Sequence, residues 1–142
     1  MIHFEMSNYL PDEAAQLRLE VFVKEQGFES EFDRFDEPDK AYHFVLFDDG
    51  SPLATCRMTD EGDGVFHIGR VAVKKSCRGR GLGAKVIAEA EDAAKDMGGK
   101  LITIGSQVQA LGFYLSQGYT KEGEQYMEEG KPHIKVYKEL CD

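Results

Sequence analysis

The sequence of 142 residues predicts one mixed α/β domain (residues 1–142), in which a mixed, mostly antiparallel sheet of seven strands is flanked by about four helices. Short runs of strand-forming residues that end in tight turn pairs predict the hairpins of the sheet. Apolar residues at helical spacing predict the helices. A chain of this length buries roughly 70% of the surface of its unfolded form, which is enough for one core and too little for two independent domains.

The N-terminal part contains a strand, a helix and an acidic segment. Residues 2–6 alternate between apolar and polar side chains and predict a short strand. Pro11, followed by the apolar Leu17 and Val21, predicts a helix that runs to about residue 23. Residues 29–40 surround two phenylalanines with acidic side chains, which predicts a short helix or a loop pinned by the aromatic rings. The acidic residues of this segment are Glu29, Glu31, Asp33, Asp36, Glu37 and Asp39.

Strand formers dominate residues 42–47 and 53–59, and the pair Asp49-Gly50 between them is suited to a tight hairpin. These two segments are therefore expected to pair as antiparallel strands. The later strand candidates are residues 65–73, 101–104, 119–127 and 133–139.

The strand candidate at residues 65–73 is the most apolar in the chain and follows a turn at residues 61–64. Gly69 interrupts it, and a glycine within a strand predicts a bulge or a close backbone approach. The last two strand candidates are expected to form a hairpin around Glu129-Gly130.

A glycine-rich stretch at residues 78–83 precedes the clearest helix of the chain. That helix is expected to stop at residues 98–99, where two glycines follow each other. Residues 109–116 predict another short helix, closed by Gly118. The apolar residues that define the long helix by their spacing are Val86, Ile87, Ala90, Ala94 and Met97.

The chain is acidic, with 26 Asp and Glu residues against 17 Lys and Arg and a formal net charge of −9. This balance argues against binding to nucleic acid or to a membrane surface, because both need an excess of exposed cations. No segment resembles a membrane span or a signal peptide, so we expect a cytoplasmic protein. Cys56, Cys77 and Cys141 are widely spaced and form no metal-binding pair, so we expect free thiols.

A short basic segment interrupts this acidic chain. Residues 74–85 contain five basic side chains and no acidic one, and they overlap the glycine-rich stretch. An anionic ligand is therefore expected at this place. The five basic residues are Lys74, Lys75, Arg78, Arg80 and Lys85.

Glycines between an apolar strand and a long helix suit phosphate, because several backbone N–H groups approach one anion at the positive end of the helix dipole. A P-loop is excluded, since Lys85 is followed by Val86 instead of a hydroxyl residue that would hold magnesium. The dinucleotide-binding fingerprint is a closer alternative, because Gly79, Gly81 and Ala84 satisfy its spacing. The hairpins before the loop do not suit that fold, and the strand after the helix ends without Asp or Glu.

Residues 78–83 (Arg-Gly-Arg-Gly-Leu-Gly), after Arg-Val-Ala-Val at residues 70–73, resemble the acetyl-coenzyme A signature of the GCN5-related N-acetyltransferases, the GNAT superfamily. Residues 110–119 are similar to the second signature of that family, in which Phe-Tyr is followed by Gly and an aromatic residue. The resemblance covers nearly the whole chain. The chain is similar to the ElaA-like subgroup through residues 18–26, 69–73 and 132–134.

The resemblance implies the GNAT acyl-CoA N-acyltransferase fold and acetyl-CoA as co-substrate, without a metal. The backbone amides of residues 78–83 would hold the pyrophosphate, and the main chain of residues 71–73 would pair with the pantetheine arm as an added strand would. The basic residues around the loop are candidates for the 3′-phosphate. The residues implied in coenzyme binding are Val71, Ala72, Val73, Arg78, Gly79, Arg80, Gly81, Leu82, Gly83, Phe113 and Tyr114.

Acyl transfer from a thioester to an amine needs a deprotonated amine, a donor for the oxyanion and an acid for the leaving thiolate. Tyr114 stands where the family places its proton donor, and ordinary phenol and thiol pKa values make this transfer uphill by only about 2 kcal/mol. The Val71 N–H, freed by a bulge, is the expected oxyanion donor. The strand at residues 65–73 contains no acid, so His67 is the first candidate for the general base. The alternatives are a water chain, Glu25 and His133.

The expected reaction is transfer of acetyl to a primary amine of a small molecule or peptide by direct attack in a ternary complex. If the acidic residues 29–39 border the acceptor channel, they would steer basic, polyamine-like substrates into it. Two other classes stay open: a CoA-binding regulatory module without catalysis, and a nucleotide-dependent oxidoreductase. The expected state is a monomer, or a homodimer formed through the C-terminal hairpin as the family implies. Candidate acceptor-binding residues are Glu25, Gln26, Arg57, Arg70 and His133.

Overall fold

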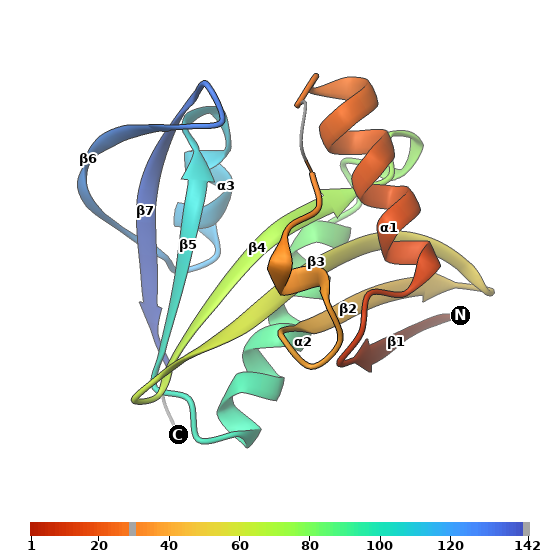
Figure 1. The fold of residues 1–142 in the computed structure, drawn as a ribbon, viewed down its shortest axis with the longest axis horizontal. Helices are drawn as coiled ribbons and strands as arrows, with labels where there is room; N and C mark the ends of the chain where they lie inside the picture. The colour runs from red at the N-terminus through yellow and green to blue at the C-terminus, as the bar shows by residue number, and fades with distance from the viewer. Residues whose placement is uncertain (29–30, 141–142) are drawn as a thin grey trace.

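The computed structural model describes residues 1–28 and 31–140, so the predictions for Glu29 and Cys141 lie outside the described residues. The strands are β1 (Ile2–Ser7), β2 (Tyr42–Asp48), β3 (Ser51–Gly62), β4 (Val65–Val73), β5 (Leu101–Gln107), β6 (Thr120–Glu128) and β7 (Lys131–Glu139). They form one seven-stranded sheet in the order β1-β2-β3-β4-β5-β7-β6 (Figure 1). All neighbours are antiparallel except β4 and β5, which are parallel. The predicted mixed, mostly antiparallel sheet is therefore confirmed.

The described α-helices are α1 (Asp12–Arg18), α2 (Leu82–Asp96) and α3 (Leu111–Ser116). The chain after α1 continues as a π-helix over Leu19–Glu25, so the first helical segment ends slightly later than expected. Figure 1 shows α1 and α2 on opposite faces of the sheet. This arrangement explains why the inner residues of β2 are buried along its whole length.

The acidic segment forms one 3-10 turn, Arg34–Asp36, where a fourth helix was one of two expectations. Its start is fixed by a capping box: the Phe35 amide donates to Asp33 Oδ1 at 3.0 Å, and the Asp33 amide donates to Asp36 Oδ2 at 2.9 Å. The segment does not continue as a helix because Glu37 returns to extended backbone. The turn lies beside β3, on the same face of the sheet as α1 (Figure 1).

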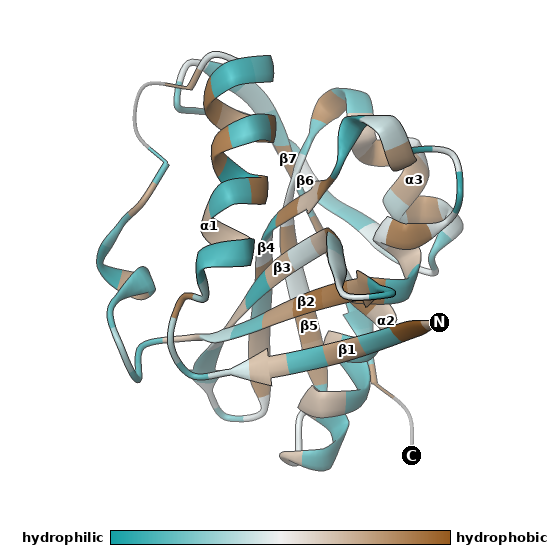
Figure 2. Ribbon diagram, turned by 90° about the vertical axis from the view of Figure 1, so that its right-hand side faces the viewer, coloured by the Kyte–Doolittle hydropathy of each residue, from teal (hydrophilic) through white to brown (hydrophobic). Residues whose placement is uncertain are grey.

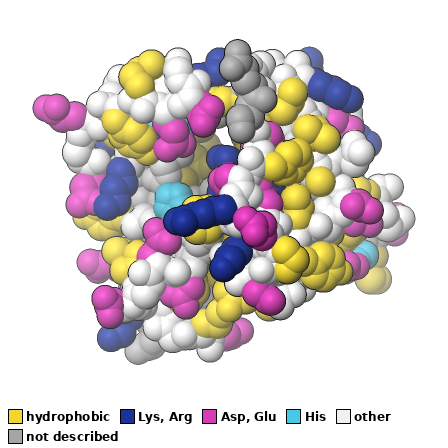
Figure 3. Space-filling model, in the orientation of Figure 1, with side chains coloured by type: hydrophobic (Ala, Val, Ile, Leu, Met, Phe, Trp, Pro, Cys, Tyr) yellow, Lys and Arg dark blue, Asp and Glu magenta, His cyan; other side chains and the backbone are white. Residues whose placement is uncertain are grey.

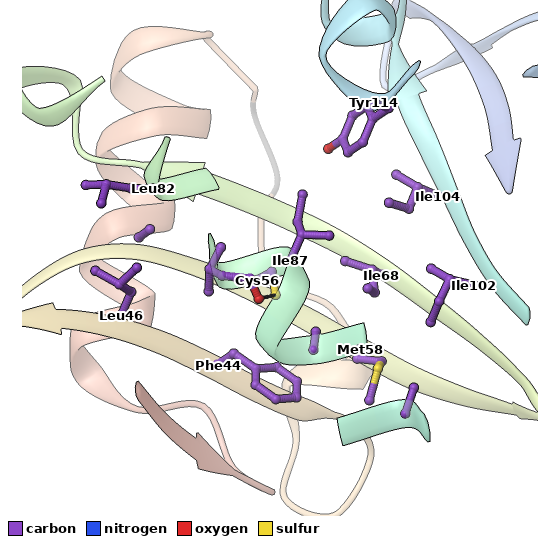
Figure 4. Packing of buried hydrophobic residues seen from close by; sticks show 14 of the residues in the cluster. Phe44, Leu46, Cys56, Met58, Ile68, Leu82, Ile87, Ile102, Ile104 and Tyr114 are labelled. Atoms are coloured by element: carbon purple, nitrogen blue, oxygen red, sulfur yellow. Dashed lines mark hydrogen bonds between the residues drawn. The ribbon is translucent and has the colours of Figure 1, made fainter. Parts of the chain in front are cut away.

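The main core fills the space between the sheet and α2 (Figure 4). Val86, Ile87, Ala90 and Ala94 are buried as their spacing predicts, whereas Met97 is 38% exposed because it follows the last turn of the helix. A smaller cluster lies under α1, whose ribbon alternates between hydrophilic and hydrophobic residues in Figure 2. The middle strands are thus covered by α2 on one face and by α1 on the other.

A bulge in β4 and the divergence of β5 shape the centre of the sheet. Against β3, Ala72 pairs with Thr55 and Gly69 pairs with Arg57, so Arg70 and Val71 together face a single residue. The expected bulge is confirmed, but Arg70, with φ of 52°, adopts the left-handed conformation one residue after Gly69. The pairing of β4 with β5 ends at Ile68 and Ile104, although β5 continues along β7. Beyond this point no strand in the described part of the chain pairs with this edge of β4.

The expected hairpins are all present, and β6 forms one edge of the sheet with every residue exposed. A 3-10 turn at Val108–Ala110 precedes α3, so this helix is shorter than the predicted residues 109–116. Cys56 and Cys77 are buried free thiols, as expected. In the described part of the chain, no helix has the length and apolarity needed to cross a membrane.

Candidate active site

A cavity of about 330 Å³ opens where β4 and β5 separate. It is lined by the β4 bulge, the far end of β5, α3, the end of the π-helix and the β6–β7 turn. We call this the inner cavity. A second, outer cavity of about 370 Å³ adjoins it and is also lined by Asp33 and Phe35 of the acidic turn, residues 31–36. Both cavities share Arg57, His67, Gly69, Arg70, Glu128 and Glu129 as lining residues. Figure 3 shows this face of the molecule as a hollow with basic and acidic side chains around it.

The glycine loop, residues 78–83, precedes α2, and none of its residues lines either cavity. Gly79 and Gly81 have positive φ angles of 82° and 74°, and a Cβ on either residue would meet nothing within 4 Å. The first hydrogen bond of α2 is donated by the Lys85 amide to the Gly81 carbonyl at 3.2 Å. Within the described residues, the amides of residues 79–84 donate no hydrogen bond. The loop therefore offers open space and free N–H donors at a helix N-terminus, which fit a pyrophosphate.

Arg78 is held in place by acceptors of its own. Its guanidinium donates two hydrogen bonds of 2.6 Å to Glu25, and bonds of 3.2 and 3.1 Å to the Val73 carbonyl. The hydrogen bond from Arg78 lowers the pKa of Glu25, so this carboxylate is a poor proton acceptor. Glu25 does not line either cavity. Glu25, a candidate base in the sequence interpretation, thus joins the π-helix to the glycine loop.

Other residues proposed for the coenzyme surround the loop. Ala72 and Leu82 are buried, and Val73 lies 3.5 Å from the position of a Cβ on Gly83. Phe113 lies at the same distance on the other side of Gly83 and is partly exposed. Arg80 approaches Asp48 at 3.7 Å. Lys74, Lys75 and Lys85 are exposed and have no ion pair within the described chain.

Tyr114 projects from α3 to the margin of the core, close to Ile104 (Figure 4). Its ring makes edge contacts with Phe113 and Tyr119, at centroid distances of 5.1 and 6.0 Å. The residue is buried but lines the cavity, and burial raises the pKa of Tyr114 above its ordinary value. The phenol therefore stays protonated near pH 7, and its transfer of a proton to a thiolate would be more uphill than ordinary pKa values suggest.

His67 and His133 both line the cavity. His67 Nδ1 lies 2.9 Å from Thr103 Oγ1, and Nε2 lies 3.8 Å from the position of a Cβ on Gly69. Burial lowers the pKa of His67, which keeps the ring neutral near pH 7. His133 Nδ1 donates to the Lys131 carbonyl at 2.9 Å. Because a carbonyl only accepts, Nδ1 carries a proton, and Nε2 lies 3.8 Å from Glu128.

Three arginines from separate elements converge on the acidic turn. Arg18 ends α1 and is only 1% exposed, Arg57 lies on β3, and Arg70 lies at the β4 bulge. Arg70 also donates to the Glu31 carbonyl at 3.2 Å, which supports its left-handed backbone. The acidic turn therefore borders the cleft with its charges neutralised. The ion pairs are Arg18–Glu31, Arg18–Asp36 (2.7 Å), Arg57–Asp33 (2.8 Å), Arg57–Asp36 (3.1 Å), Arg70–Glu31 (2.9 Å) and Arg70–Asp33 (3.3 Å).

Gln26 bridges the two sides of the cleft. Its Oε1 accepts a hydrogen bond of 2.8 Å from Gln107 Nε2 at the end of β5. The sequence interpretation included Gln26 but missed Gln107, Thr103 and the cavity-lining Tyr126. Thr103 could have been noticed in the sequence as a polar residue within an apolar strand. Gln107 and Tyr126 line the cavity only because distant strands pair, which the sequence does not reveal.

The chain resembles known acyltransferases in sequence and in fold. A family model described as acetyltransferase (GNAT) domain matches residues 7–140. The uncharacterised N-acetyltransferase YjcF of Bacillus subtilis is 32% identical over 128 residues, which cover 89% of this chain and 91% of that protein.

Solved structures agree with the family match. The crystal structure of Escherichia coli ElaA has a TM-score of 0.85 and 26% identity, and the match covers 97% of this chain and 99% of ElaA. A Bacillus subtilis acetyltransferase in complex with CoA shares the fold, with a TM-score of 0.76 at 18% identity over 99% of this chain and 100% of that one. With its open strand edge and free glycine-loop amides, the chain belongs to the GNAT acetyltransferase family, and ElaA is among its structural neighbours.

Proposed function

We propose that this protein transfers the acetyl group of acetyl-CoA to a primary amine by direct attack within a ternary complex. The observation that carries the proposal is the unpaired edge of β4 at Arg70 and Val71, beside the point where β5 diverges. An extended ligand that reaches this edge finds backbone donors and acceptors that no strand uses. It also passes Tyr114, which lines the same cavity.

The coenzyme would lie between the glycine loop and the bulge. Its pyrophosphate would accept hydrogen bonds from the amides of residues 79–84, and its pantetheine arm would run along residues 71–73. Acetyl-CoA supplies the thioester whose acetyl group is transferred. The CoA complex of the Bacillus subtilis acetyltransferase supports this choice of co-substrate.

The Val71 amide and Tyr114 would act on opposite ends of the thioester. The Val71 N–H, which faces no single partner on β3, stabilises the negative charge that develops on the carbonyl oxygen. The carbon–nitrogen bond to the amine forms as the carbon–sulfur bond breaks. The phenol of Tyr114 then protonates the departing sulfur, and its raised pKa keeps it protonated until the thiolate appears.

His67 is the favoured acceptor of the amine proton. It lines both cavities, and burial lowers its pKa so that the ring is neutral near pH 7. Glu25 is disfavoured by its two hydrogen bonds to Arg78 and by its position outside the cleft. His133 stays an alternative, since its Nε2 has no hydrogen bond among the described residues and it lines the inner cavity.

Ligand binding and turnover test the proposal separately. Acetyl-CoA and CoA should raise the melting temperature, because a ligand that binds only the native state stabilises it, whereas NAD and ATP should not. Amine-dependent release of CoA, followed with a thiol reagent, should then appear with a panel of aliphatic amines. Stabilisation without turnover on any amine would favour the regulatory CoA-binding module. Stabilisation by NAD alone would overturn the proposal.

A further inference from the structure

We infer that the acceptor is an aliphatic diamine or polyamine, whose second ammonium group binds at a carboxylate wall formed by Glu61, Glu128 and Glu129. This inference rests on the proposed acetyltransferase function and names its substrate class. One amino group would lose a proton and become acetylated, while the other stays charged. All three glutamates line the outer cavity, as does Asp33 of the acidic turn.

The arginines of the cleft are not available to an anionic acceptor. Arg57 and Arg70 line both cavities, but each is paired with two carboxylates of the acidic turn. With Arg18 included, three arginines face Glu31, Asp33 and Asp36, so the network is neutral as a whole. Glu31, Asp33 and Asp36 therefore offer little net negative charge to an acceptor, and the steering role considered for residues 29–39 stays a prediction. The charge preference of the cleft therefore depends on the carboxylate wall.

The carboxylate wall is not neutralised. Among residues 1–28 and 31–140, none of its three glutamates lies within 4.0 Å of a Lys or Arg nitrogen. Glu128 lies 3.8 Å from His133 Nε2, and Glu61 accepts a hydrogen bond of 3.3 Å from Thr59. Lys131 stands over the Phe28 ring at 5.5 Å and does not line either cavity. A cation in the outer cavity would thus meet excess negative charge.

His133 and Tyr126 line the inner cavity, where His133 lies beside Glu128, a glutamate that lines both cavities. The His133 side chain is only 6% exposed, and its Nε2 has no hydrogen bond within the described structure. A ring that donates from Nδ1 to the Lys131 carbonyl leaves Nε2 as the ring nitrogen available to a ligand. Tyr126 stacks on His133 at 5.9 Å, and its hydroxyl lies 2.7 Å from the position of a Cβ on Gly105. The aromatic ring offers a second face to a cation.

The size of the cleft agrees with a small acceptor. Cavities of about 330 and 370 Å³ lie at the lower end of the range of small-molecule sites. Part of the inner cavity must also admit the acetyl end of the coenzyme. A slender aliphatic chain can cross from His67, which both cavities share, to Glu128 and Glu129.

Three amines with four carbon atoms each test the charge preference: 1,4-diaminobutane, butylamine and 4-aminobutanoate, which carry a positive, no and a negative distal charge. We expect kcat/KM to fall in that order. Replacing Glu128 with glutamine should reduce the ratio of kcat/KM for the diamine to that for butylamine by about fivefold, because the group is half exposed and its charge is partly screened. Glu122→Gln is the matched control, since Glu122 lies on the same strand, pairs with Lys135 and does not line the cavities.

Calorimetric binding of the amines without acetyl-CoA separates the two proposals. Tighter binding of the diamine that weakens in Glu128→Gln supports the cation site even if no amine is acetylated, in which case the acetyltransferase function alone fails. Turnover with equal kcat/KM for diamine and butylamine, or the same ratio in Glu128→Gln and Glu122→Gln, overturns the cation site and leaves the acetyltransferase function in place. Absence of both binding and turnover overturns both.

Discussion

Replacing His43 with leucine should make the protein less sensitive to acid. His43 lies on β2, is 1% exposed, and its Nε2 has no hydrogen-bond partner among the described residues. The pKa of His43 falls from 6.5 to about 4, mainly because the ring is buried. The nearby Arg18 also lowers the pKa, and its effect exceeds the opposite effect of Asp36. The folded protein therefore holds this ring neutral at a pH where the unfolded chain binds a proton.

The sign and size of the effect follow from linkage. The contribution of His43 to the free energy of unfolding is complete above pH 6.5 and is lost as the pH falls toward 4, because the unfolded state takes up the proton first. Each pH unit in this window removes about 1.4 kcal/mol from the free energy of unfolding, or roughly 3 kcal/mol in total. About 2 kcal/mol of this loss should fall between pH 7 and pH 5. Leucine has nearly the same volume and no proton to bind.

Urea unfolding of wild type and His43→Leu at pH 7, 6 and 5 measures the difference directly. The free energy of unfolding of the variant, relative to wild type, should rise by about 2 kcal/mol from pH 7 to pH 5. His3→Leu, which removes an exposed histidine from β1, should keep the wild-type pH dependence. Parallel pH profiles for His43→Leu and wild type would refute the reasoning and imply that the buried ring is charged or hydrated.

Three further substitutions probe other parts of the molecule. Tyr114→Phe should lower kcat by about 100-fold and leave the affinity for acetyl-CoA unchanged, as steady-state kinetics and calorimetry would show. Arg18→Met should reduce the free energy of unfolding by about 3–5 kcal/mol, because Glu31 and Asp36 lose a buried partner, whereas Arg34→Met on the exposed side of the turn should cost less than about 1 kcal/mol in urea unfolding. Gly81→Ala should cost about 1 kcal/mol through its left-handed backbone and weaken coenzyme binding in titration calorimetry.

The local features of this fold could be predicted because they depend on short stretches of sequence. Asp49-Gly50 and Glu129-Gly130 adopt positive φ angles in the turns that they were expected to form. The spacing of Val86, Ile87 and Ala90 identified the buried face of α2 correctly. Turn chemistry and helical periodicity act over a few residues, so one sequence is enough to reveal them.

The site was harder to predict because it is assembled from distant segments. The bulge was expected at a glycine, but Arg70 adopts the left-handed backbone, held by hydrogen bonds to a turn nearly forty residues earlier. No pattern in the sequence indicated that Arg18 would be buried, since arginines are usually exposed. The roles of His67 and Glu25 also depended on contacts across the fold, with Thr103 and Arg78.

The two walls of the cleft differ in how freely they can change. The side formed by the acidic turn depends on six coupled charges, and the loss of any buried member would destabilise the whole protein. The side formed by β6 is exposed along its whole length, and substitutions at exposed positions usually alter stability by about 0.5 kcal/mol or less. If acceptors bind here as proposed, substitutions on β6 would change the range of amines that the protein accepts while the free energy of unfolding stays nearly constant.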